Sequence, residues 1–212
     1  MLHTSLQLLK DHGACTSGYA KLLKHLGGNV SNFGKDTPIP LTTVLESNDV
    51  PDTLWCFRAV LPEERKAAGT MTLLYSADCL ERGFLRHEAK LKKEAPLIRE
   101  FIEKMRGFAN GTTTAADFQE VAHRVYRADL AYLADRADRA YRAYLAYLAD
   151  LADLAYLAYL VYLADRAYLA DRADLADLAD EEKWLAQRLR SYLEGTPLEP
   201  VSAPEPQKEQ PK

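Results

Sequence analysis

Hydrophobic residues in the first half of the chain recur every three to four positions, which is the spacing of one face of an α-helix. This pattern predicts helices over residues 5–11 and 14–26, and Gly27-Gly28 is placed to end the second one. Prolines open the next predicted helices, because the first turn of a helix tolerates a residue without an N–H group. These further segments are residues 40–48, 51–60, 62–94 and 96–109.

Residues 29–40 are predicted to be a loop, since Gly34 and two prolines interrupt any regular element there. No alternating run of β-branched residues is long enough to predict a useful strand, so the expected fold class is all-α. Thr114, with Asp117 three residues later, is spaced to cap a following helix. We therefore expect a helical N-terminal domain over residues 1–111.

From Ala122 to Glu181 the chain reads in triplets: Ala or Val, then mostly Asp or Tyr, then mostly Leu or Arg. A 3₁₀-helix would stack the triplets into straight columns, but such helices seldom exceed four residues. Wound as an α-helix at about 100° per residue, the tract places most charged residues on one side and most leucines and tyrosines on the other. Residues 112–194 are therefore predicted to form a triplet-repeat region of long α-helices.

The middle of the repeat, from Tyr156 to Leu163, is apolar on every side, and such a helix must be covered. An unbroken helix over residues 114–193 would be about 120 Å long at 1.5 Å per residue. Folding back into a helical hairpin, with a turn or kink near residues 163–167, is the favoured solution. Burial against a second copy or a partner protein is the alternative. The strict triplet phase could also be a relic of DNA-repeat expansion.

Composition and charge narrow the classes of function. The net charge is −4, and the repeat accounts for all of it, with arginines interleaved among its acids. Without a basic stripe, nucleic-acid binding is not expected, and the interleaved arginines argue against mimicry of DNA. No run of about 18 uncharged apolar residues predicts a membrane span. Three cysteines and no recognisable signal peptide favour a cytoplasmic location, and the proline-rich residues 195–212 are predicted to be a disordered tail.

Candidate chemical motifs are incomplete. The stretch GNVSNFGKD departs from a phosphate loop in its glycine spacing, and Asp36 replaces the hydroxyl that would hold Mg²⁺. Cys15, three residues after His12, is half of a metal or nucleophile site without a second half, so a buried thiol beside a surface histidine is the simpler interpretation. His87-Glu88 lacks the second histidine of a zinc-protease helix. The sequence therefore predicts no catalytic residue, no metal ligand and no cofactor, and we expect a protein that is not an enzyme.

The polar face of the repeat is the candidate partner-binding surface. Aspartate and arginine alternate there, and tyrosine is enriched in protein interfaces because it combines apolar area with a polar group. The candidate partner-binding residues are Asp135, Asp138, Arg139, Arg142, Tyr147, Asp150 and Asp153.

Three stretches resemble one known family. They are HGACTSGYAKLLKHLGG (12–28), DTPIPLTTVLESNDVPDTLWCFRAV (36–60) and LIREFIEKMRGFANGTTTAADF (97–118), running into an alanine-rich repeat. Over residues 10–190 or so, the chain resembles the alanine-rich immunity proteins of bacterial and phage polymorphic toxin systems. The resemblance implies an all-α inhibitor that binds a toxin's catalytic domain and occludes it without chemistry of its own.

Two functions therefore stay open. One is a protein-binding module of the immunity or inhibitor type, with a toxin-like partner that its helical surface engages. The other is a structural or self-assembling protein, carried by a phage or a bacterium, whose repeat is an oligomerisation rod that packs on copies of itself.

Overall fold

The computed structural model describes residues 1–88, 95–127 and 175–202, and these are mostly helical. Within those ranges the strands are β1 (His3–Thr4) and β2 (Ile39–Pro40), which pair antiparallel with His3 opposite Pro40. The all-α prediction is confirmed at this level. In the same ranges, no helix combines the length and the apolar character that crossing a membrane would require.

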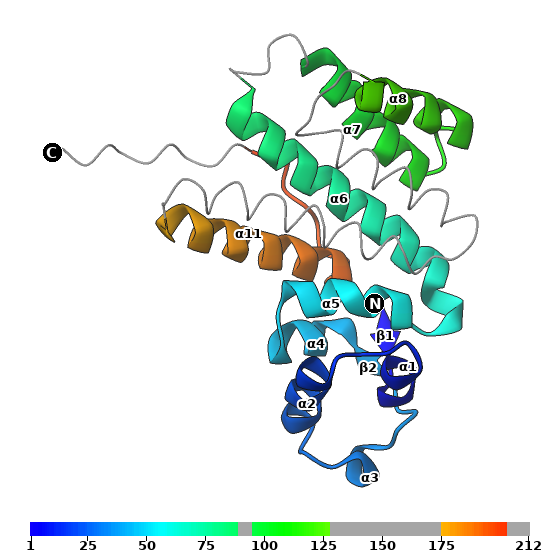
Figure 1. Cartoon of the computed structure of the whole chain (residues 1–212), viewed down its shortest axis with the longest axis vertical. Helices are drawn as coiled ribbons and strands as arrows, with labels where there is room; N and C mark the ends of the chain where they lie inside the picture. The colour runs from blue at the N-terminus through cyan, green and yellow to red at the C-terminus, as the bar shows by residue number, and fades with distance from the viewer. Residues whose placement is uncertain (89–94, 128–174, 203–212) are drawn as a thin grey trace, which may run out of the picture.

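The longest described helix, α6 (Arg65–His87), runs through the middle of the molecule (Figure 1). Its sequence carries two apolar stripes that lie about 150° apart at 100° per residue. Each stripe is buried in a different hydrophobic cluster, so α6 separates two cores and contributes side chains to both. The first stripe consists of Ala68, Tyr75 and Cys79, and the second of Leu73, Ala77, Leu80 and Phe84.

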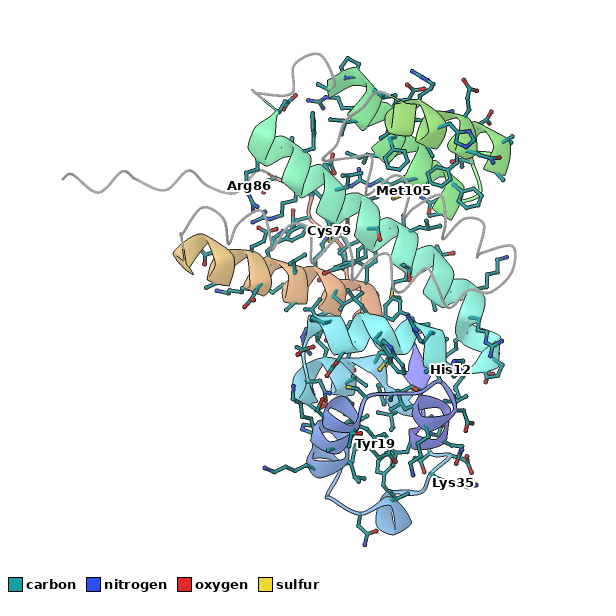
Figure 2. The ribbon with its side chains drawn as sticks, viewed as in Figure 1. His12, Tyr19, Lys35, Cys79, Arg86 and Met105 are labelled. Carbon is teal, nitrogen blue, oxygen red and sulfur yellow. The ribbon has the colours of Figure 1, made fainter. Side chains whose placement is uncertain are left out.

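The second cluster joins α6 to α7 (Ala95–Ala109) and α8 (Ala115–Arg127). The ring of Phe118 stacks on both Phe101 and Phe108, with ring centroids 5.7 and 5.4 Å apart. Met105, labelled in Figure 2, is buried in the same cluster. These contacts fold α8 back onto α7.

The turn before α8 confirms the predicted cap. The hydroxyl of Thr114 accepts a hydrogen bond from the backbone N–H of Asp117 at 3.1 Å and donates one to its carboxylate at 2.8 Å. One otherwise unpaired N–H of the first turn is thereby satisfied. Because this cap needs only residues three positions apart, the sequence was sufficient to predict it.

The first cluster gathers the N-terminal elements and one element from the far end of the chain. The N-terminal strand β1 is fixed by long-range bonds, since Thr4 donates its hydroxyl to the Ala59 carbonyl at 2.6 Å. The helices that surround this cluster are α1 (Leu6–Asp11), α2 (Thr16–His25), α4 (Leu41–Ser47) and α5 (Val50–Cys56), followed by the 3₁₀ turns η1 (Phe57–Ala59) and η2 (Pro62–Glu64).

Most predicted helices of this half are present, and the differences have physical reasons. The predicted loop 29–40 contains the one-turn helix α3 (Val30–Phe33) and strand β2. Pro40 belongs to that strand and precedes α4 instead of lying within its first turn. Strand β2 forms because it pairs with residues 35 to 37 positions away, a contact that local periodicity does not reveal.

The C-terminal helix α11 (Leu175–Glu194) packs against α4, α5 and α6. Leu185, Leu189 and Leu193 are buried in the first cluster beside the N-terminal helices. Both α8 and α11 were assigned to the repeat region by sequence, and both lie on helices of residues 1–111. The central repeat, including the predicted hairpin with its turn near residues 163–167, lies outside the described residues, and the domain boundaries stay predictions.

Charged side chains also hold α11 to α6. Glu181 is 4 % exposed and accepts hydrogen bonds from Arg82 Nε at 2.9 Å and from Arg86 Nη2 at 2.5 Å. Asp78, 2 % exposed, accepts from Arg188 Nε at 2.7 Å and from the Tyr192 hydroxyl at 2.5 Å. Buried ions are tolerated only when they are paired and hydrogen-bonded. These two carboxylates therefore select one register of α11 against α6.

The beginning of the tail is in contact with the rest of the molecule. Residues 195–202 contain no helix or strand, but the carbonyls of Glu199 and Ser202 accept hydrogen bonds from Arg188 and Arg82. Two arginine side chains therefore contact the backbone of this segment, and the predicted disorder of the tail stays a prediction. Residues 203–212 lie outside the described residues.

Candidate functional site

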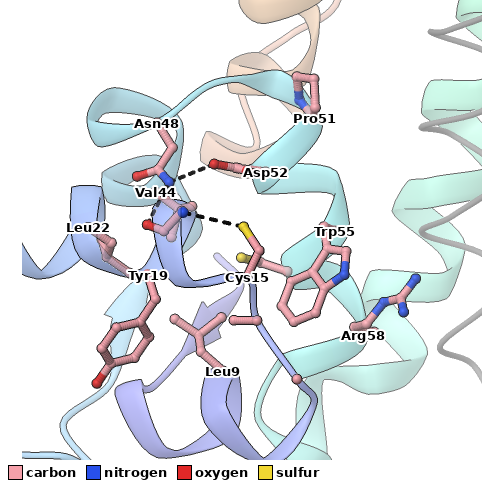
Figure 3. A pocket seen from close by; sticks show the side chains of 14 residues that line it. Leu9, Cys15, Tyr19, Leu22, Val44, Asn48, Pro51, Asp52, Trp55 and Arg58 are labelled. Carbon is pink, nitrogen blue, oxygen red and sulfur yellow. Dashed lines mark hydrogen bonds between the residues drawn. The ribbon is translucent and has the colours of Figure 1, made fainter.

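A cavity of about 240 Å³ opens between α1, α2, α4 and α5 (Figure 3). Its walls are mainly apolar, and they come from all four helices because each turns an aliphatic or aromatic side chain toward the same space. The apolar lining includes Leu9 of α1, Leu22 of α2, Val44 of α4 and Trp55 of α5.

One wall of the pocket depends on the close approach of α2 to α5 at Gly18. A Cβ atom at this position would lie 3.0 Å from Asp52 Oδ2 and 3.2 Å from Cys15 Sγ. Asn48 joins the two helices by donating to the Gly18 carbonyl at 2.9 Å and to Asp52 Oδ2 at 2.7 Å. A larger residue would make the Asp52 and Cys15 side chains shift by a few tenths of an ångström, so packing favours glycine here, although it weakens helices in general.

The thiol of Cys15 lies at the start of α2. Its Sγ accepts the backbone N–H of Gly18 at 3.3 Å, so the side chain acts as the N-cap of the helix. Cys15 is exposed, which corrects the expectation of a buried thiol. Cys15 lines the pocket and belongs to neither hydrophobic cluster, so its side chain is not enclosed. His12 ends α1 as its C-cap residue.

A second thiol, Cys56, lines the same pocket from α5 but is buried. Burial raises the pKa of the Cys56 thiol well above its usual range, and the negative charge of Asp52 raises it further, while Arg58 opposes the shift. The neutral thiol is a weak nucleophile because the thiolate is the reactive form. Cys56 therefore contributes a small apolar surface to the pocket and not a reactive group.

A tryptophan and an arginine form the rim of the pocket. The guanidinium carbon of Arg58 lies 5.2 Å from the centre of the Trp55 ring, within cation–π range. Among the described residues, the buried Nε–H of Arg58 finds no hydrogen-bond acceptor, and the same holds for the buried hydroxyl of Tyr19. An unsatisfied buried donor costs free energy, so a ligand with an acceptor group near Arg58 would gain a hydrogen bond.

The sequence predicted a different set of residues as the partner-binding surface. Asp135, Asp138, Arg139, Arg142, Tyr147, Asp150 and Asp153 all lie outside the described residues, so the structure neither brings them together nor separates them. The pocket was missed by sequence reasoning, and Trp55, which lines it, is half-buried and packs against the first cluster. The stretch PDTLWCFRAVLP does carry the Trp–Arg pair three residues apart, but nothing in it shows that α1 and α2 leave a space beside it.

Potential metal ligands and a second groove are the other features of the described ranges that bear on a functional site. No group of three or more histidine, cysteine or carboxylate side chains in them could hold a metal ion. A wider groove lies between α5 and α11, lined by Pro51, Gln187 and Arg190 among others, with charges of both signs.

Comparison with known proteins adds no relative. No protein-family model matches the chain, and neither a curated protein nor a solved structure is similar enough to count as a match.

Proposed function

We propose that the protein is a protein-binding module of the inhibitor type, and that the pocket between α1, α2, α4 and α5 holds an anchor side chain of its partner. The observation that carries the proposal is the pocket itself: a mainly apolar cavity whose rim is formed by Trp55 and Arg58. Tryptophan and arginine are the residues that most often dominate the binding energy of protein interfaces.

The size of the cavity supports a side chain over a larger small molecule. Sites for drug-sized ligands usually enclose about 300–1,000 Å³, and this cavity encloses about 240 Å³. A single apolar or aromatic side chain fits such a space, and burying one in a desolvated pocket commonly contributes 2 kcal/mol or more, on the order of a hot spot.

The resemblance to immunity proteins supplies the proposed role of this binding, which is to occlude a toxin-like protein. The charged face of the repeat, defined by the seven residues from Asp135 to Asp153 given above, is proposed as a second contact surface. Self-assembly through the repeat is the competing function, and it differs in its partner, which would be another copy of the same chain.

Filling the pocket tests the proposal. Ala14 lines the cavity, so Ala14→Trp should occupy it, whereas Ala20→Trp adds the same ring on the exposed side of α2 and is the matched control. Tagged protein and both variants are used to capture proteins from a host lysate, with quantitative mass spectrometry of the bound fraction. We expect one protein to be retained by the wild type and by Ala20→Trp and to be lost with Ala14→Trp.

Two outcomes would contradict the proposal. Equal retention by both variants would show that the pocket is not the docking site. Self-assembly would be favoured if no partner is captured and light scattering shows a molecular mass that rises with protein concentration, in the wild type and in Ala14→Trp alike.

A further inference from the structure

The segment that follows α11 is bound to the body of the protein through its backbone. Figure 1 shows it leaving the end of α11 and crossing to α6. The carbonyl of Glu199 accepts a hydrogen bond from Arg188 Nη1 at 2.5 Å, and the carbonyl of Ser202 accepts one from Arg82 Nη1 at 3.1 Å. Residues 196–202 (TPLEPVS) thus contact the surface through their own backbone carbonyls, which accept hydrogen bonds from arginine side chains.

The two arginines are built into the fold. Each uses its Nε for a buried carboxylate, Arg82 for Glu181 and Arg188 for Asp78, and turns Nη1 to the tail. Arg82 is only 7 % exposed. The Trp184 ring lies between them, 4.4 Å from the guanidinium carbon of Arg82 and 6.0 Å from that of Arg188. We call Arg82, Trp184 and Arg188 the arginine–tryptophan platform.

The spacing of the two carbonyls fits an extended, proline-type backbone. Pro197 and Pro200 fix their own φ angles near −65°, and each disfavours the helical conformation of the residue before it. The polyproline II helix has three residues per turn and no internal hydrogen bonds. Glu199 and Ser202 are three residues apart, so in that conformation both carbonyls point the same way and are free to accept from outside.

The tail is a weak occupant of the platform. Leu198, its largest apolar side chain, is 36 % exposed and is one of two large hydrophobic residues that are exposed within the described ranges. No residue from 195 to 202 belongs to either hydrophobic cluster. The contact therefore depends mainly on backbone hydrogen bonds and buries Leu198 and Val201 only in part, so a segment that buries a side chain fully would bind better.

We propose that the arginine–tryptophan platform is a binding site for an extended, proline-containing segment of a partner protein, and that residues 196–202 occupy it in cis until such a segment displaces them. The site is separate from the pocket of the proposed function and does not rest on it. Binding of a second copy's tail is disfavoured. That tail would make the same contacts as the chain's own tail, but it would lack the high effective concentration that covalent attachment gives.

That attachment sets the size of the expected effect. A segment tethered by a short linker competes at an effective concentration on the order of millimolar. Such competition weakens the apparent binding by a factor of one plus the ratio of this effective concentration to the dissociation constant, so a free peptide with a dissociation constant of about 0.1 mM should bind the full chain about tenfold more weakly than a chain that ends at Gly195. The shortened chain keeps every residue of both hydrophobic clusters, and its thermal unfolding is measured alongside.

The test uses a fluorescent peptide with the sequence of residues 195–206 and follows its anisotropy. We expect saturable binding to the chain ending at Gly195 and weaker binding to the full chain, by about tenfold if the dissociation constant is about 0.1 mM. Binding should be lost when both prolines at positions 197 and 200 of the peptide are replaced by alanine. In the shortened chain, Arg188→Lys keeps the charge but removes the forked donor, and should weaken binding. Arg124→Lys, on α8 and paired with Glu100, is the matched control.

Three results would overturn the proposal. One is the absence of saturable binding to the shortened chain at about 5 mM peptide, above the effective concentration of a tethered tail. Another is equal affinity for peptides with and without the prolines. The third is a full-chain dimer that disappears on shortening, which would show that the occupant is the tail of a second copy.

Discussion

Removing the charge of Glu181 is the sharpest test of how α11 is held. In Glu181→Gln the shape of the side chain is kept, but Arg82 and Arg86 lose the buried anion that both of them contact. Deleting one partner of a buried ion pair commonly costs about 3–5 kcal/mol, because the other charge is left uncompensated. Glutamine retains one acceptor oxygen, so we expect the lower end, about 3 kcal/mol.

A matched surface pair gives the control. Glu46 accepts from Arg190 at 3.0 Å, and both side chains are largely exposed, at 48 % and 40 %. Water and salt screen such a pair, so Glu46→Gln should change the free energy of unfolding by about 0–1 kcal/mol. The two substitutions make the same chemical change and differ in burial.

Urea unfolding followed by circular dichroism measures both variants. With a urea dependence of about 2 kcal/mol per molar, a loss of 3 kcal/mol lowers the midpoint by about 1.5 M. The double variant Arg82→Met/Glu181→Leu should recover part of that loss, because the charges of the two most buried members are removed together. Arg86 keeps its charge, but its side chain is more exposed, at 17 %. If Glu181→Gln and Glu46→Gln shift the midpoint equally, the Glu181 carboxylate is not desolvated and the account of the α6–α11 contact is wrong.

Two further predictions concern the pocket. Gly18→Ala should destabilise the protein by about 1–3 kcal/mol through crowding against Asp52 Oδ2, despite the better helix propensity of alanine. Thermal unfolding measures the effect, with Ser17→Ala as the control. An unchanged melting temperature for Gly18→Ala would refute the close approach. The exposed Cys15 should react rapidly with a thiol reagent at pH 8. Cys56 and Cys79 should react only on unfolding, because both are buried and burial raises the pKa of the Cys56 thiol. Three equally fast thiols would show that the pocket side of α5 is open to solvent.

Local chemistry explains which elements were predictable. The hydroxyl of Thr114 caps α8 from three residues away, and the positive φ of Gly28 follows the end of α2, where its N–H bonds to the Leu23 carbonyl. Pro51 lies in the first turn of α5. All of these features depend on residues within about five positions, so they are visible in the sequence as motifs.

The pocket was not predictable in the same way. Trp55 and Arg58 are neighbours on one helical segment, but the cavity beside them exists because Leu9, Leu22 and Val44 arrive from three other helices and do not fill it. Sequence periodicity identifies which face of a helix is apolar, but it does not determine how closely two such faces approach. Gly18 contributes to that approach, because a Cβ atom there would lie 3.0 Å from Asp52 Oδ2 on α5.

The sequence by itself determined the helical class, most helix boundaries and the two apolar stripes of α6. Only the tertiary structure decided what each stripe packs against, where α11 lies, and that Arg82 meets Glu181 across 99 residues of chain. The physical reason is that helix formation and capping are satisfied by near neighbours, whereas the pairing of apolar faces and buried charges is chosen by fit among segments that are distant along the chain.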